Sequence, residues 1–426
     1  MTGISNPVAA EAPRSRDELE VLQRRTLMSL RLTQVPGQAA VAGMVAVVSL
    51  LAGDLLGSDR LAGMGSASFT LGAALTAIPL AAYMRRRGRR RGLALALLIG
   101  SGGSAVAALG GEVRLFPVFV IGMIAFGAGQ AATLQQRYVA ADLAEPARAG
   151  SAIAAIVWVG TLGAVFGPLL TPVAKAFGRS VGVDELVGPF IVGSILFAVS
   201  AAVVTIRLRP DPLEVLGTID PHAERVRPLR QVRASSSVIA SSVNARLGLV
   251  AMAISQAAMV GVMTMTPPHM KDHDHGDLSA YVIALHIVGM YALAPLVGRF
   301  SDRVGQNQAI RYGAVILGLG TISTVMAGYV PVLMFVGLFF LGLGWNIGII
   351  AGSALLTRSV PAETRVEVQG TADLAMSLCG ATAAFGSGFV KESFGFHLLA
   401  NGAAGLAAAL LILAWYTNLR PVTPVR

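Results

Sequence analysis

Long apolar segments recur throughout this 426-residue chain, and they constrain its fold more than any other feature. Each segment is about 20 residues long, the length at which an α-helix crosses the hydrocarbon core of a bilayer. Transmembrane β-strands would instead alternate apolar and polar residues over about ten positions. A content of 54% hydrophobic and 13% charged residues also argues against a soluble globular protein. The sequence therefore predicts an all-α membrane protein with twelve transmembrane helices.

A polar segment divides these predicted helices into two groups of six. Residues 207–246 are rich in Pro, Ser and Arg and form a predicted cytoplasmic linker between a first half, 32–206, and a second half, 247–418. We expect residues 1–31 and 419–426 to be a cytoplasmic N-terminal segment, helical on the membrane surface or without structure, and a cytoplasmic tail.

A weak internal repeat supports the division into two halves. Three small or helix-breaking residues of the first half recur 215 positions later in the second half, at the same mutual spacing. Repeated halves are common among transporters. The pairs are Gly127 with Gly342, Gly129 with Gly344, and Pro146 with Pro361.

The formal charge of +10 is concentrated in alternate loops. Basic residues cluster at 85–91, in the linker, and after the eighth apolar segment at Arg299, Arg303 and Arg311. This is the positive-inside pattern of membrane proteins. We therefore expect a plasma-membrane protein whose basic loops and both termini lie in the cytoplasm. The pattern does not indicate nucleic-acid binding. Cys379 is the only cysteine, which excludes an intramolecular disulfide and a multi-cysteine metal site.

Two neighbouring apolar segments carry candidate metal ligands at helical spacing. Met259 and Met263 lie in the segment 247–268, and His286 and Met290 lie in the segment 278–298. Each pair has i, i+4 spacing, which places both side chains on one face of a helix. Thioethers and imidazole suit Cu(I) better than Mg(II) or Ca(II), so these residues predict a metal site near mid-membrane. Ordinary core packing by methionine is the alternative.

The loop between these segments is also rich in possible ligands. It contains His269, Met270, His273 and His275, and we expect it to face outward, where it captures metal or is simply solvated.

Energy coupling has weaker signals in the sequence. No G-x-x-x-x-G-K-[ST] motif for ATP is present, which favours a secondary transporter without a bound cofactor. Asp54 and Asp373 are the clearest acids within predicted spans, and such residues are candidates for proton coupling. No recognisable catalytic arrangement is present, so we expect no enzymatic activity.

A loop motif after the eighth segment gives the first family resemblance. Gly298, Asp302, Arg303 and Gly305 match G-x-x-x-D-R-x-G, the signature loop of the major facilitator superfamily. The resemblance implies that superfamily's fold and a gating role for this loop. In the first half, Arg85 stands where the family has its acid.

The fifth segment carries a second motif. Gly163, Gly167 and Pro168 resemble the G-x-x-x-G-P motif that is frequent among exporters of this superfamily. Close packing of small residues between helices is the alternative reading.

The methionine and histidine pairs narrow the resemblance further. Met259, Met263, His286 and Met290 resemble the M-x-x-x-M and H-x-x-x-M motifs of CcoA-like copper importers. That resemblance implies copper import by alternating access in a monomer. The alternatives are a proton-coupled transporter of a small organic solute or drug, and a membrane sensor or scaffold.

Overall fold

The computed structural model describes residues 15–57, 63–222, 227–275, 278–327 and 330–418. Within these ranges the regular secondary structure is helical, without a strand, which confirms the predicted all-α class. Eleven of the described helices are long and apolar enough to cross a membrane, and a bent pair, Tyr281–Ala292 with Ala294–Val304, adds a twelfth when counted as one span. The predicted tail 419–426 and residues 1–14 lie outside the described residues.

Six long helices form what we call the N half. They are α1 (Arg16–Leu56), α2 (Gly63–Arg87), α3 (Arg89–Glu112), α4 (Phe116–Asp142), α5 (Ala149–Ser180) and α6 (Gly188–Arg207). A short 3₁₀ turn, η2 (Pro146–Arg148), precedes α5.

Two shorter helices, α7 (Pro212–Val215) and α8 (Pro228–Ser241), lie in the segment between the halves. The C half then consists of α9 (Val243–Asp272), α10 (Ser279–Ile287), the π-helix η4 (Val288–Ala292), α11 (Ala294–Val304), α12 (Gln306–Ala327), α13 (Pro331–Arg358), α14 (Arg365–Phe394) and α15 (Phe396–Asn418).

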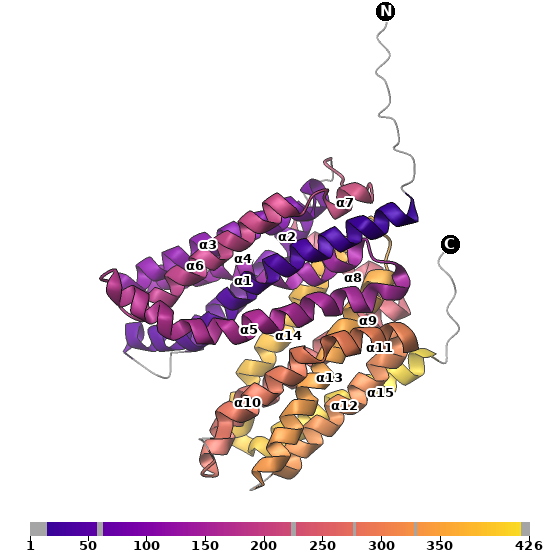
Figure 1. Ribbon diagram of the computed structural model, residues 1–426. Helices are drawn as coiled ribbons and strands as arrows, with labels where there is room; N and C mark the ends of the chain where they lie inside the picture. Colours follow the sequence, from indigo (N-terminus) through magenta and orange to yellow (C-terminus); the bar gives the residue numbers. More distant parts are fainter. Residues whose placement is uncertain (1–14, 58–62, 223–226, 276–277, 328–329, 419–426) are drawn as a thin grey trace, which may run out of the picture.

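Figure 1 shows the two halves as separate helical bundles that lie against each other. The start of α1, the end of α15, α7 and α8 lie at the same end of the molecule (Figure 1). We call this the basic end, because the arginine-rich segment 85–91 joins α2 to α3 there.

The first helix includes most of the predicted N-terminal segment. It begins at Arg16 behind a capping box and continues past residue 31 without a break. Ser15 Oγ accepts from the Glu18 amide at 3.2 Å, and Glu18 Oε2 accepts from the Ser15 amide at 3.0 Å. Gln23 Nε2 also donates to the Ala140 carbonyl at 2.7 Å. The N-terminal segment is therefore packed against α4 as part of the first span.

The predicted histidine-rich loop is also partly helical. Helix α9 continues to Asp272 and includes Pro267 and Pro268, so His269 and Met270 belong to its last turn. Helix α9 therefore continues beyond residue 268, where the predicted apolar segment ends.

The repeated glycines make equivalent contacts in the two halves. A Cβ atom added at Gly127 of α4 would lie 2.4 Å from the Phe69 carbonyl oxygen of α2, and one at Gly342 of α13 would lie 2.5 Å from the His286 carbonyl oxygen of α10. Only glycine allows such close helix approach. Each half therefore has the same tight contact between its second and fourth spans.

Candidate functional site

A cavity of about 320 Å³ lies between the two halves. Its wall comes from α1, α2, α4 and α5 of the N half and from α9, η4, α13 and α14 of the C half. Cavities of this size hold small organic molecules. A site between two halves that can rock against each other is the usual location of a transported substrate.

The N-half wall presents amide groups without protein partners. Gln34 of α1 and Gln130 of α4 line the cavity, and the Oε1 atom of each is buried with no hydrogen-bond partner among the described residues. Buried carbonyl oxygens are normally paired, because leaving one unpaired costs about 1–3 kcal/mol. Both residues therefore bring unused hydrogen-bonding capacity to the cavity wall.

The C-half wall presents aromatic and thioether groups. Tyr291 and Trp345 meet edge to face, with ring centroids 5.7 Å apart, and Trp345 Nε1 donates to Gln256 Oε1 at 2.7 Å. Met259 and Met290 line the same wall, and Met376 of α14 joins them. This wall suits a flat apolar ring.

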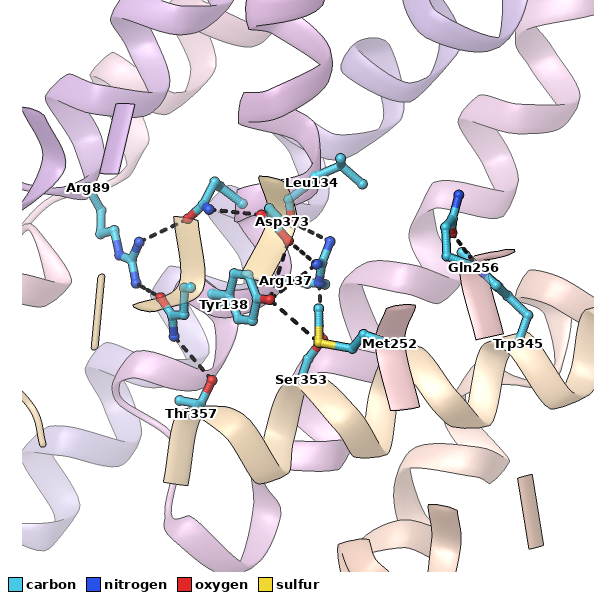
Figure 2. A network of polar contacts seen from close by, with 12 residues as sticks. Arg89, Leu134, Arg137, Tyr138, Met252, Gln256, Trp345, Ser353, Thr357 and Asp373 are labelled. Carbon is cyan, nitrogen blue, oxygen red and sulfur yellow. Dashed lines mark hydrogen bonds and ion pairs between the residues drawn. The ribbon is translucent and has the colours of Figure 1, made fainter. Parts of the chain in front are cut away.

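A buried polar network closes the cavity toward the basic end (Figure 2). Arg137 of α4 lines the cavity and forms an ion pair with Asp373 of α14. Gln135 Nε2 donates to Asp373 Oδ2 at 2.8 Å, and Tyr138 Oη donates to Asp373 Oδ1 at 3.3 Å. Arg137 Nε also donates to Ser353 Oγ of α13 at 3.2 Å. Since α4 belongs to one half and α13 and α14 to the other, the network joins the two halves.

Arg89 extends this network nearer to the basic end. Its buried guanidinium pairs with Asp142 at 2.8 Å and donates from Nη1 to Gln135 Oε1 at 3.2 Å. It also donates from Nη2 to Gln369 Oε1 of α14 at 2.5 Å, and Gln369 Nε2 donates to Thr357 Oγ1 at 3.1 Å. A buried guanidinium is stable only when its donors are satisfied in this way.

The predicted gating motif also lies between the halves. Asp302 of α11 accepts from the Gly150 amide at 2.9 Å and from the Ser151 amide at 2.8 Å, at the start of α5. The free amides and the dipole of a helix N-terminus favour a carboxylate there. Gly298 approaches α5 so closely that an added Cβ would lie 2.4 Å from Ala154 Cβ. Gly305 has a φ of +85°, and Arg303 is exposed.

The first half makes the corresponding contact with the opposite charge. Arg85 Nη1 donates to Glu367 Oε1 of α14 at 2.5 Å. An added Cβ at Gly370 would lie 2.5 Å from Ala81 Cβ, which parallels the approach of Gly298 to Ala154. An arginine at the acid position of the motif therefore still joins the halves, because its partner helix supplies the acid.

The four predicted metal ligands do not line one cavity wall. Met259 and Met290 line the cavity, whereas Met263 and His286 are not part of its wall. The Nδ1–H group of His286 donates to the Leu338 carbonyl at 2.7 Å, since this face of α10 packs against α13. His286 Nε2 is buried without a hydrogen-bond partner among the described residues.

The predicted outer metal-capture residues lie at the opposite end from the basic end. His269 is buried and stacks on Phe396, with ring centroids 4.1 Å apart, and His273 Nδ1–H donates to the His269 carbonyl at 2.8 Å. Met270 is buried, and His275 is half-buried. Among the described residues, no group of three or more His, Cys, Asp or Glu side chains is arranged to hold a metal ion.

The two acids predicted for proton coupling differ in position. Asp373 is buried in the network between the halves. Asp54, at the end of α1, forms an ion pair with Arg114 at 3.0 Å, and its side chain is 45% exposed.

The helix 5 motif lies within the N half. An added Cβ at Gly163 would lie 2.6 Å from the Val35 carbonyl oxygen, and one at Gly167 would lie 2.7 Å from the Ala39 carbonyl oxygen. These glycines therefore allow α5 to pack closely on α1. Pro168 follows inside α5.

Sequence analysis missed the amides and aromatic residues of the cavity. Gln34, Gln130 and Trp345 lie within predicted spans, and polar side chains there are the signal that could have identified them.

Comparison with known proteins gives consistent similarities. The sequence profile of the Major Facilitator Superfamily matches residues 37–384 and, in a second match, 273–426. The chain is 36% identical over 408 residues to the uncharacterized MFS-type transporter YddS of Bacillus subtilis (strain 168), covering 94% of this chain and 93% of the relative. It is 27% identical over 401 residues to the riboflavin transporter RfnT of Brucella anthropi, covering 93% and 96%. The crystal structure of the human organic anion transporter MFSD10 (TETRAN) has a similar fold, with a TM-score of 0.75, 17% identity, and coverage of 92% of this chain and 99% of that one.

Proposed function

Because this chain belongs to the major facilitator superfamily, a family of multi-pass secondary transporters and not of enzymes, we propose that it carries a small planar organic solute through the cavity between its halves. The observation that supports this proposal is the pairing of two walls. Gln34 and Gln130 offer unpaired hydrogen-bond acceptors, and Tyr291 and Trp345 offer aromatic surface opposite them. A solute with ring N–H donors matches both walls.

The contacts between the halves define the conformation of this proposed transporter. The network around Asp373, the Asp302 contact and the Arg85 contact lie toward the basic end, within about two turns of the helix ends there. For a protein in the plasma membrane, the positive-inside rule predicts that the basic end faces the cytoplasm. These contacts close the basic end, as we expect for an outward-facing state of the transporter.

Asp373 is the proposed coupling residue. Its negative charge holds Arg137 and thereby joins α4 to α14. Protonation of Asp373 would remove this charge and release the ion pair, which the inward-facing state requires. Alternating access would then depend on the charge of one buried carboxylate.

The amide wall provides the sharpest test of the solute proposal. Riboflavin is the first solute to test, since it is named for a relative and has a planar ring system with an N–H donor. We expect Gln34→Leu with Gln130→Leu to weaken riboflavin uptake into cells or proteoliposomes by about tenfold or more, because the buried N–H donor of the ring is then left without an acceptor. Gln308→Leu removes an amide that contacts Arg311 outside the cavity and is the matched control. Equal uptake by both variants would contradict the proposal.

Copper transport is a second candidate, favoured by one observation. Met259, Met290 and Met376 place three thioether side chains on the C-half wall, and thioethers suit Cu(I). The same uptake assay with copper, using Met259→Leu with Met290→Leu, separates the two candidates. Loss of copper accumulation with unchanged riboflavin uptake would favour copper as the cargo.

A further inference from the structure

A second cavity, of about 460 Å³, lies at the basic end and is separate from the site described above. Three consecutive arginines at the end of α2, Arg85 to Arg87, line one side. Gln231 and Ser235 of α8 and Glu367 of α14 line the others. The cavity therefore lies where the N half, the segment between the halves and the C half meet.

Two of these arginines are not neutralised by neighbouring acids. Arg85 pairs with Glu367 and lies 3.8 Å from Asp220. Arg86 and Arg87 make no ion pair with another described residue. The cavity consequently has unbalanced positive charge, which favours an anion.

Buried hydrogen-bond donors without partners also favour an anionic ligand. Arg86 Nε and Gln231 Nε2 are both buried and have no hydrogen-bond partner among the described residues. Gln231 is only 7% exposed. A buried donor normally finds an acceptor, and an anionic oxygen is the strongest acceptor for a guanidinium.

The remaining wall is apolar. Ile78, Pro79, Ala82 and Val238 line it beside the arginines. A ligand with a phosphate group and an apolar part fits this combination, because arginine matches the geometry of phosphate oxygens.

We propose that this cavity binds the phosphate group of a phosphate ester through Arg86, Arg87 and Gln231, and that the bound ligand favours closure of the basic end. Walls from both halves form the site, so it is complete only in this conformation. A ligand that binds one conformation shifts the population toward it. The phosphate ester is either an anionic phospholipid or a soluble metabolite. This proposal does not depend on which solute the central cavity carries.

The test uses the delipidated full-length protein in detergent. We expect phosphatidylglycerol, but not phosphatidylcholine, to raise the thermal unfolding midpoint followed by tryptophan fluorescence. A parallel titration with glycerol 3-phosphate distinguishes a soluble ligand from a lipid. A response to either anion supports the site, and a response to neither overturns it.

Variants then locate the response. Arg86→Gln with Arg87→Gln should raise the half-saturating concentration of the active anion by about tenfold or more. Arg90→Gln with Arg91→Gln removes the same charge from the same segment outside the cavity and should leave it unchanged. Equal effects of both pairs would show only general electrostatic attraction and would overturn the proposal.

A charge-neutral variant covers the case in which the double variant fails to fold. Gln231→Leu should also weaken anion binding, and an unchanged half-saturating concentration would contradict the site.

For the conformational effect, a single cysteine at Thr357 in a Cys379→Ser background reports access from the basic end. Its labelling by a water-soluble maleimide should slow when the anion is added, and unchanged labelling would refute closure by the ligand.

Discussion

At the residue scale, one buried carboxylate organises the contact between the halves. Asp373 accepts hydrogen bonds from Gln135, Arg137 and Tyr138, all on α4. Its intramembrane position alone marked it as a functional candidate in the sequence. Its partners were not predictable, because they depend on how two helices from different halves face each other.

We expect Asp373→Asn to abolish the response of solute uptake to an imposed pH gradient and to destabilise the closed contact between the halves at the basic end. Asparagine leaves Arg137 buried without a counter-charge, and breaking one side of a buried pair costs about 3–5 kcal/mol. Uptake with and without the gradient, together with the thermal unfolding midpoint, measures both effects. Asp54→Asn, at a 45% exposed carboxylate, is the control. A gradient response retained by Asp373→Asn would remove this residue from coupling.

At the element scale, each half places the end of one helix against a helix of the other half. In the second half, Asp302 caps α5. In the first half, Arg85 occupies the equivalent position and pairs with Glu367 at the start of α14. The first half therefore joins the other half through a side-chain ion pair, and the second half through a carboxylate that caps a helix.

Exchange of the two charges tests this contact directly. We expect Arg85→Glu and Glu367→Arg each to reduce transport several-fold, because each places two like charges in contact. The combined variant should recover most of the activity, since an ion pair forms again. Transport rates of all four proteins complete a double-mutant cycle. Additive losses in the combined variant would show that the pair does not contribute to the transport cycle.

At the scale of the whole molecule, the two repeated halves meet through matching close contacts. Gly298 lies against Ala154, and Gly370 lies against Ala81. Both contacts belong to the closed basic end, and neither has space for a side chain.

We therefore expect Gly298→Val and Gly370→Val to shift the protein toward opening of the basic end by similar amounts. In each, the new side chain overlaps the facing alanine, at 2.4 and 2.5 Å from its Cβ atom. Labelling of Thr357→Cys in the Cys379→Ser background should accelerate in both variants. Gly402→Val, where no atom lies within 4 Å of an added Cβ, is the control. Faster labelling in only one variant would show that the two contacts are not equivalent.

The sequence by itself determined the class of fold and its division into halves. Apolar segments of bilayer length, the alternating charge of the loops and the Gly298 to Gly305 motif are local signals, and each depends only on residues near one another in the chain. They predicted helices, their number and the family. Composition did not define two helix ends: a capping box at Ser15 starts α1 within the charged N-terminal segment, and α9 continues through Pro267 and Pro268 to Asp272.

Only the tertiary structure decided which side chains share a site. Helical spacing correctly placed Met259 and Met263 one turn apart, but it does not state which neighbouring helix each face meets. Contact with α13 turned His286 away from the cavity wall, while Gln34 of α1, Gln130 of α4 and Trp345 of α13 came to line it. A site assembled from both halves depends on distances between segments far apart in the chain, and those are set by helix packing.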